Sequence, residues 1–129
     1  MSGLSVIAMV AFGGALGSVL RYLVAGWLQP QWWPGFPFGI FVVNITGGLV
    51  MGLITGLAAL KLHLTPEMRA FLTTGILGGY TTFSTFSLDS VMLMERGAYG
   101  QAIAYVVGSV FLSILALFCG LWLMRAVYA

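Results

Sequence analysis

One stretch of this sequence, Gly75–Ser87, gathers residue types that could do chemistry in a chain that is otherwise strongly apolar. It reads GILGGYTTFSTFS and holds three aromatic rings and six hydroxyl-bearing side chains. Hydroxyl groups can donate hydrogen bonds in place of water, and the hydrogen-bearing edge of an aromatic ring is electropositive. Together these groups suit a small, strongly hydrated anion, which they could bind without the full charge that would trap it.

The two phenylalanines of this stretch, Phe83 and Phe86, are three residues apart and would share one face of a helix. Ser84 and Thr85 lie between the rings and add hydroxyl donors. Two phenylalanines in a membrane helix usually serve packing, and that interpretation stays open beside the anion-binding one.

Two further polar residues stand alone within apolar segments. Asn44 lies in the run FVVNITG, where its amide could donate hydrogen bonds to an anion or join two helices. Arg21 lies about two turns before the end of the first apolar segment. Its guanidinium could reach the membrane surface or draw anions towards the mouth of a pathway, and both interpretations stay open.

Tyr105, Ser109 and Ser113 recur at four-residue spacing in the last apolar segment. This spacing places three hydroxyl groups on one face of a helix, as a row of hydrogen-bond donors. For either serine alone, a bond to the carbonyl four residues earlier is the simpler expectation. The alignment of all three favours a polar track.

The composition places these residues in a lipid bilayer. Of the 129 residues, 60% are hydrophobic and only 6% are charged, and the mean hydropathy is +1.06. These values are typical of an integral membrane protein, here with one domain over residues 1–129. The net charge of +2 comes from scattered side chains, so we expect no nucleic-acid partner. Cys119 is the only cysteine, which excludes an intrachain disulfide.

Four apolar segments are long enough to cross a membrane as helices, at about 1.5 Å per residue. They span residues 4–28, 38–60, 66–94 and 98–127, approximately. The third is longer than a crossing needs and contains Gly75–Ser87, so we expect a break in it. Irregular backbone survives at membrane depth only where protein buries it or where it lines a hydrated cavity. The predicted fold class is therefore all-α, with four transmembrane helices per chain.

Local signals mark the ends of these segments. The run Thr65, Pro66 and Glu67 predicts the start of a helix, with an N-cap, a proline in the first turn and an acid near the helix N-terminus. Gly97 predicts a stop and restart between the last two segments.

Small residues predict close packing between helices. Gly48, Gly52 and Gly56 repeat at four-residue spacing in the second segment, and Gly13 and Gly17 do so in the first. Such faces let helix backbones approach each other in a bilayer. Four helices are few to surround an ion pathway, so we expect an oligomer, with a two-fold symmetric dimer as the default.

The positive charges give a weak signal for orientation. With four crossings, Lys61, Arg69 and Arg125 fall on one side of the membrane, and Arg21 and Arg96 fall on the other. Because an excess of such charges fixes topology, this near balance predicts insertion in both orientations. A single topology decided by a few residues stays the alternative.

The whole chain resembles the small bacterial fluoride channels of the Fluc (CrcB-type) family. The motifs that carry the resemblance are GGALGS at 13–18 with RY at 21–22, VNITG at 43–47, and Gly75–Ser87 with its TTFSTF core. Each motif is weak alone, whereas their order and spacing are specific. The resemblance implies an antiparallel, dual-topology homodimer with two fluoride pores and one central, structural sodium ion.

Carried over by motif, the resemblance also assigns roles to single residues. The residues that it places along the pores are Asn44, Phe83, Phe86, Tyr105, Ser109 and Ser113. It assigns the main-chain carbonyls of Gly78 and Thr81 to the sodium ion, and Tyr80 is bulkier than the family pattern suggests.

The sequence therefore predicts a passive fluoride channel, not an enzyme, that exports fluoride across the cytoplasmic (inner) membrane of a bacterium. No two acids lie at the spacing of a catalytic pair. A small proton-coupled multidrug exporter is the main alternative, and it would need a membrane-embedded acid, which the first helix lacks. A noncatalytic subunit of a larger membrane assembly would explain the glycine faces but not the aligned donors.

Overall fold

The computed structural model describes residues 3–129, and within them the chain forms helices and no strand. In chain order these are α1 (Gly3–Leu28), α2 (Phe38–Leu60), α3 (Pro66–Arg69), the π-helix η1 (Ala70–Leu77), α4 (Gly78–Tyr80), α5 (Ser84–Glu95) and α6 (Tyr99–Tyr128). Three of them, α1, α2 and α6, are long and apolar enough to cross a membrane. The expectation of an all-helical membrane protein is thereby confirmed.

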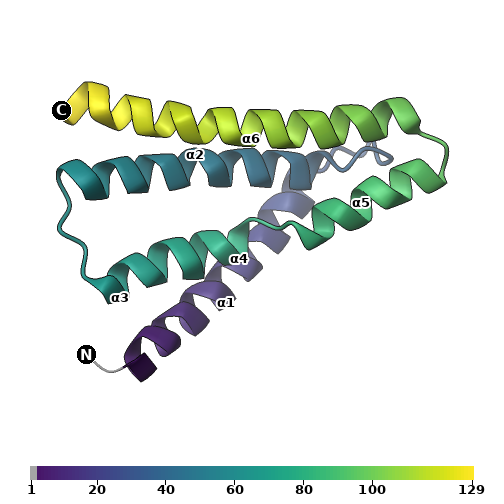
Figure 1. Cartoon of the computed structure of the whole chain (residues 1–129). Helices are drawn as coiled ribbons and strands as arrows, with labels where there is room; N and C mark the ends of the chain where they lie inside the picture. The colour runs from purple at the N-terminus through teal and green to yellow at the C-terminus, as the bar shows by residue number, and fades with distance from the viewer. Residues whose placement is uncertain (1–2) are drawn as a thin grey trace.

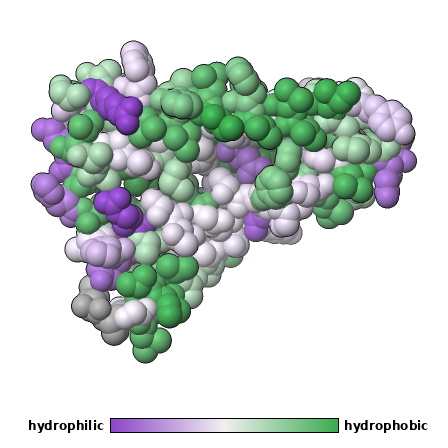
Figure 2. Space-filling view, in the orientation of Figure 1, coloured by the Kyte–Doolittle hydropathy of each residue, from purple (hydrophilic) through white to green (hydrophobic). Residues whose placement is uncertain are grey.

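The surface is that of a protein surrounded by lipid. Large apolar side chains such as Phe12, Phe111, Phe118 and Trp122 are exposed. Figure 2 shows hydrophobic residues along α6, whereas hydrophilic residues lie mostly at opposite ends of the molecule, with a smaller group between them. The polar ends fit the two membrane surfaces, with the apolar band between them in the hydrocarbon.

The predicted helix ends are confirmed where local signals mark them. Thr65 caps α3, since its side chain accepts a hydrogen bond from the backbone N–H of Met68 at 3.2 Å, and Pro66 opens the helix. Gly97, between α5 and α6, has a φ of 76°, a left-handed conformation that glycine adopts without strain.

The chain is arranged around two close helix contacts (Figure 1). In the first, α2 and α6 run side by side in the same direction. A Cβ added at Gly48 would lie 2.6 Å from the carbonyl oxygen of Ser113, and one at Gly120 would lie 2.6 Å from that of Leu49. The predicted glycine face of α2 is therefore a packing surface against α6.

In the second contact, α1 crosses η1 and α4. A Cβ at Gly13 would lie 2.7 Å from the carbonyl oxygen of Phe71, and one at Gly79 would lie 2.6 Å from that of Gly14. Small residues on both sides thus bring the two backbones together, as predicted for Gly13. This contact positions the segment that leads into the functional site.

Candidate functional site

The helical segment that follows α3 is interrupted between α4 and α5. Thr81 has extended backbone, with φ −82° and ψ 157°, and helical geometry returns at Phe83, with φ −91° and ψ −36°. We call residues 81–83 the break. The expected interruption within 75–87 therefore lies at its TTF sequence.

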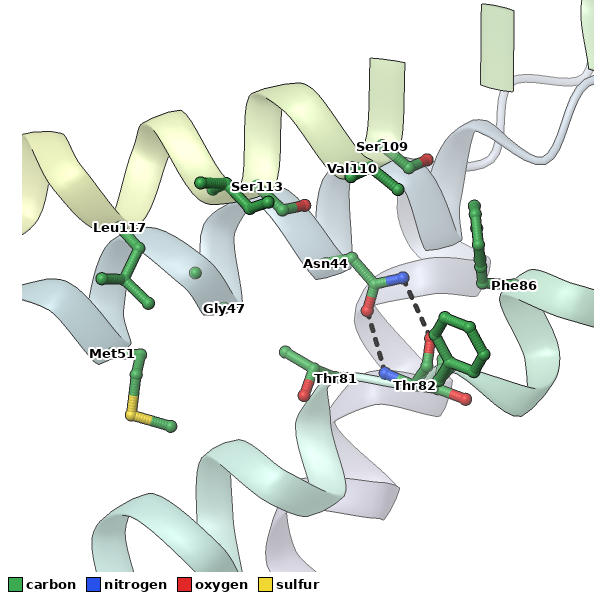
Figure 3. A pocket seen from close by; sticks show the side chains of 13 residues that line it. Asn44, Gly47, Met51, Thr81, Thr82, Phe86, Ser109, Val110, Ser113 and Leu117 are labelled. Carbon is green, nitrogen blue, oxygen red and sulfur yellow. Dashed lines mark hydrogen bonds between the residues drawn. The ribbon is translucent and has the colours of Figure 1, made fainter. Parts of the chain in front are cut away.

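Asn44 of α2 holds the break through its side-chain amide (Figure 3). Its Oδ1 accepts a hydrogen bond from the backbone N–H of Thr82 at 2.9 Å, and its Nδ2 donates to the carbonyl oxygen of Thr82 at 3.1 Å. One amide thus satisfies both backbone groups of Thr82, which the interrupted helix leaves unpaired. We call this pair of bonds the Asn44 clamp. The second Nδ2 hydrogen remains to be donated elsewhere.

The break redirects two backbone donors. In an unbroken α-helix, the N–H of residue 82 would bond to the carbonyl of Gly78, and that of Thr85 to the carbonyl of Thr81. Here the first donates to Asn44 Oδ1, and the second donates to the hydroxyl oxygen of Thr82 at 3.1 Å. The carbonyls of Gly78 and Thr81 therefore lose their helical donors.

These two carbonyls fit the sodium ion that the resemblance implies. Neutral main-chain oxygens at a helix break are ligands that sodium takes inside membranes. In the part of the chain that is described, no group of three His, Cys, Asp or Glu residues could hold a metal instead. Gly78 is exposed, and a Cβ there would come near only Thr73 of the preceding turns, at 3.5 Å. The Gly78 side of α4 is therefore accessible to another oxygen ligand of a cation.

A cavity of about 430 Å³ lies between α2, the break and α6, and we call it the main cavity. Its lining includes Asn44, Gly47, Gly48, Met51, Thr81, Thr82, Phe83, Phe86, Ser109, Val110, Ser113, Ile114 and Leu117. Six of the predicted site residues are therefore brought together here: Asn44, Thr81, Phe83, Phe86, Ser109 and Ser113. Polar groups are few in this lining, and they come from all three elements.

Ser109 and Ser113 present buried hydroxyl groups that have no hydrogen-bond partner among the described residues. Other hydroxyls in the chain bond to the carbonyl four residues earlier, as Thr73 and Ser90 do. The two serines do not, although this was the simpler expectation for each. A buried hydroxyl without a partner is costly, and both of these line the main cavity.

The third residue of the predicted polar track, Tyr105, lies elsewhere. Its side chain is fully buried, and its hydroxyl donates to Oδ2 of Asp89 at 3.0 Å. It is absent from the lining of the main cavity. The helical spacing therefore placed the three residues on one side of α6, but the longer tyrosine side chain reaches towards α5.

The two phenylalanines at the break have different surroundings. Their ring centroids are 5.6 Å apart, with the planes inclined by 47°. Phe86 is only 8% exposed, and its ring centroid lies 5.2 Å from that of Tyr105, whereas Phe83 is 77% exposed. Phe86 thus belongs to the packed core as well as to the cavity, and Phe83 projects from the chain.

The remaining predicted site residues lie outside the main cavity. Arg21 and Thr85 line a second cavity of about 490 Å³, together with Ser18 and Asp89. Ser84 is exposed at the start of α5. The second cavity is lined by one cation, one carboxylate and three hydroxyl-bearing side chains, the third being that of Tyr22.

Comparison with known proteins identifies the chain. The model of the family described as "CrcB-like protein, Camphor Resistance (CrcB)" matches residues 8–121. This chain belongs to the CrcB-like family. The resemblance inferred from its motifs is therefore confirmed.

Relatives in this CrcB-like family are similar over nearly their whole length. A protein of Rhizobium meliloti is 53% identical over 120 residues, which cover 93% of this chain and 96% of the relative. A protein of Agrobacterium fabrum is 52% identical over 122 residues, 95% and 98% of the two chains. One of Caulobacter vibrioides is 45% identical over 124 residues, 95% and 98%. Each of the three is named "Fluoride-specific ion channel FluC".

Sequence reasoning did not predict three contacts that shape the site in this CrcB-like chain, although it singled out Tyr80 for its size. The backbone of Thr82 is the partner of Asn44, Tyr80 bonds to Thr46 on α2, and Asp89 accepts the Tyr105 hydroxyl. A signal was available only for Asp89, because an ionisable residue within an apolar segment calls for a named partner.

Proposed function

We propose that this protein is a passive fluoride channel. The proposal is supported by its membership in the CrcB-like family and by relatives named fluoride-specific ion channels. The observation that carries it is the main cavity, which is lined both by Ser109 and Ser113, whose hydroxyls have no partner among the described residues, and by a phenylalanine pair. A channel catalyses no reaction, and this cavity contains donors for an ion and no pair of acids.

The lining suits an anion that must give up water. Hydroxyl groups and the free Asn44 N–H replace water molecules one at a time, and ring edges of Phe83 and Phe86 add a weak positive potential. Among residues 3–129, no lysine or arginine lines the main cavity, so the anion is stabilised without being held by a full charge. Arg21, in the second cavity, raises the anion concentration near the entrance.

The functional unit in this proposal is an antiparallel homodimer with dual topology. The segment from Pro66 to Glu95 makes the fourth crossing, alongside the three long helices. Phe83 is largely exposed in one chain, as is the Gly78 face, so a second copy would complete both the cavity and the break. Two chains related by a two-fold axis form two pores. Three positive side chains on one side and two on the other support insertion in both orientations.

The proposal also includes one structural sodium ion on the dimer axis, held by the carbonyls of Gly78 and Thr81 from both chains. When bound, the ion would satisfy oxygens that the break deprives of donors. The chain's own contribution is to fix these oxygens, through the Asn44 clamp and the Thr82 hydroxyl.

We place the channel in the cytoplasmic membrane of a bacterium, where it exports fluoride. Fluoride that enters as the neutral acid ionises in the cytoplasm, and the negative-inside potential drives the anion out. No proton gradient is needed, in contrast to a proton-coupled exporter.

The test is ion efflux from liposomes that contain the purified protein, with voltage set by potassium and equal pH on both sides. We expect fluoride to leave and chloride to be retained. Equal efflux of the two ions would remove the selectivity, and efflux only under a proton gradient would favour the exporter. Labelling a tag at one terminus from each side of the membrane tests dual topology, and one orientation throughout would contradict it.

A further inference from the structure

Tyr80 ends α4, immediately before the break, and its side chain crosses to α2. Its phenolic oxygen lies 3.0 Å from Oγ1 of Thr46. The ring lies over Gly47, where an added Cβ would come within 3.3 Å of a ring carbon. Neither Tyr80 nor Thr46 is among the described residues that line the main cavity. The pair therefore acts on the backbone rather than on an anion.

The direction of this hydrogen bond follows from the neighbours of Thr46. The Thr46 hydroxyl already donates its one hydrogen to the carbonyls of Val42 and Val43, at 2.8 and 3.1 Å. Tyr80 must then be the donor and Thr46 the acceptor. A phenylalanine at position 80 would keep the ring over Gly47 but would leave Thr46 without this donor.

Hydrogen bonds to α2 thus hold both sequence neighbours of Thr81. On one side the Tyr80 hydroxyl bonds to Thr46, and on the other the backbone of Thr82 bonds to Asn44. The residue between them is extended and carries one of the carbonyls proposed for sodium. With both neighbours fixed to the same helix, the peptide planes around Thr81 cannot rotate independently of α2.

We propose that Tyr80 is a positioning residue for the cation site, and that its bond to Thr46 fixes the directions of the Gly78 and Thr81 carbonyls. This inference rests on the sodium ion of the proposed function. Without the bond, the end of α4 is held only by its contact with α1 and by the Asn44 clamp that follows it, and the oxygens spend less time in the arrangement that binds the ion.

The test measures how much sodium is needed for two effects, slowing of dimer dissociation and support of fluoride efflux, with a large organic cation replacing sodium. For Tyr80→Phe we expect the half-effective sodium concentration to rise about threefold to tenfold in both, the range of one net hydrogen bond. Efflux at saturating sodium should stay within about twofold of the unsubstituted protein, because the cavity is unchanged.

Variants of Thr46 and a tyrosine control make the result specific. Thr46→Val should raise the half-effective sodium concentration by a similar factor, and the double variant of Tyr80→Phe with Thr46→Val should raise it little further. Thr46→Ser keeps the hydroxyl group, so its half-effective sodium concentration should equal that of the unsubstituted protein. Tyr99→Phe, at an exposed tyrosine at the start of α6, should change nothing. Unchanged sodium curves in both Tyr80→Phe and Thr46→Val would overturn the role of Tyr80. If the unsubstituted dimer shows no sodium dependence, the cation site itself is lost, whereas fluoride efflux would still stand.

Discussion

α2 is held to two of its neighbours, α6 and the broken segment, in opposite ways. Towards α6 it presents glycines, and in the described part of the chain no side-chain hydrogen bond joins α2 to α6. Towards the broken segment it presents polar side chains, with two hydrogen bonds between Asn44 and the backbone of Thr82 and one between Thr46 and Tyr80. One helix therefore contains both kinds of membrane packing.

The difference follows from what each neighbour leaves unsatisfied. α6 is continuous, so its backbone groups are paired within the helix, and close contact is all that α2 must provide. The break leaves N–H and C=O groups without helical partners, and in a bilayer no water replaces them. Side chains of α2 therefore satisfy these groups, and the carbonyls that they do not satisfy are the candidates for an ion.

The largest expected effect comes from breaking the contact between α2 and α6. In Gly52→Val the added side chain would meet the backbone of Leu117, which cannot move without displacing α6. We expect almost no folded dimer in size-exclusion chromatography. The control is Gly100→Ala, since a Cβ there has nothing within 4 Å. Normal folding of Gly52→Val would show that this contact is not needed.

Removing the Asn44 clamp should have the next largest effect, and it should affect transport more than folding. Asn44→Leu leaves two backbone groups of Thr82 unpaired, at about 1–3 kcal/mol each. We expect fluoride efflux to fall by at least about 100-fold. Asn44→Asp should also block efflux, because its charge repels the anion.

A second residue of α2 in the main cavity controls for this effect. Met51→Leu changes that lining without touching the break, and its efflux should stay within about twofold. Normal efflux in Asn44→Leu would mean that other contacts hold the break, and the comparison between the two faces of α2 would fail.

The sequence predicted the part of this arrangement that local signals determine. Pro66 and Gly97 act through their own backbone geometry, so the ends of their helices could be inferred without a structure. The glycine spacing in α2 predicted a packing face, because residues four apart lie on the same side of a helix. The identity of the neighbour, α6, required the tertiary arrangement.

The site residues divide in the same way. The spacing of Ser109 and Ser113 sufficed to predict a shared face, and both reach the main cavity. Tyr105 has the same spacing, but its hydroxyl follows the position of Asp89, which depends on how α5 packs on α6. The partner of Asn44 lies 38 residues away along the chain, and no periodicity indicates it.

The two phenylalanines separate packing from transport. Phe83→Ile keeps a large apolar side chain but removes the electropositive ring edge, so we expect normal dimer assembly and efflux reduced by about tenfold or more. Phe86→Ile should reduce efflux and also lower the melting temperature, because Phe86 packs on Tyr105. Full efflux in a folded double variant would show that both rings serve packing alone.

The serine hydroxyls should have a smaller effect. Ser109→Ala and Ser113→Ala remove buried groups that lack a partner, so folding should be unaffected or slightly improved. Water can take the place of one hydroxyl, and we expect efflux to fall about threefold for each variant and further for both together. Unchanged efflux in the double variant would remove the serines from the anion pathway.

The smallest effect on transport should come from the third hydroxyl of the same helix. In the structure, the Tyr105 hydroxyl bonds to Asp89 and is not part of the main cavity, so Tyr105→Phe should leave fluoride efflux within about twofold. It should lower the free energy of unfolding by about 1–2 kcal/mol, because the carboxylate loses a donor. If the two groups act as a pair, adding Asp89→Leu to Tyr105→Phe should lower the free energy of unfolding little further. A double-mutant cycle of thermal stability measures this. If Tyr105→Phe instead reduces efflux as much as the serine variants do, the hydroxyl contacts the anion during transport, and the polar track inferred from helical spacing has three members rather than two.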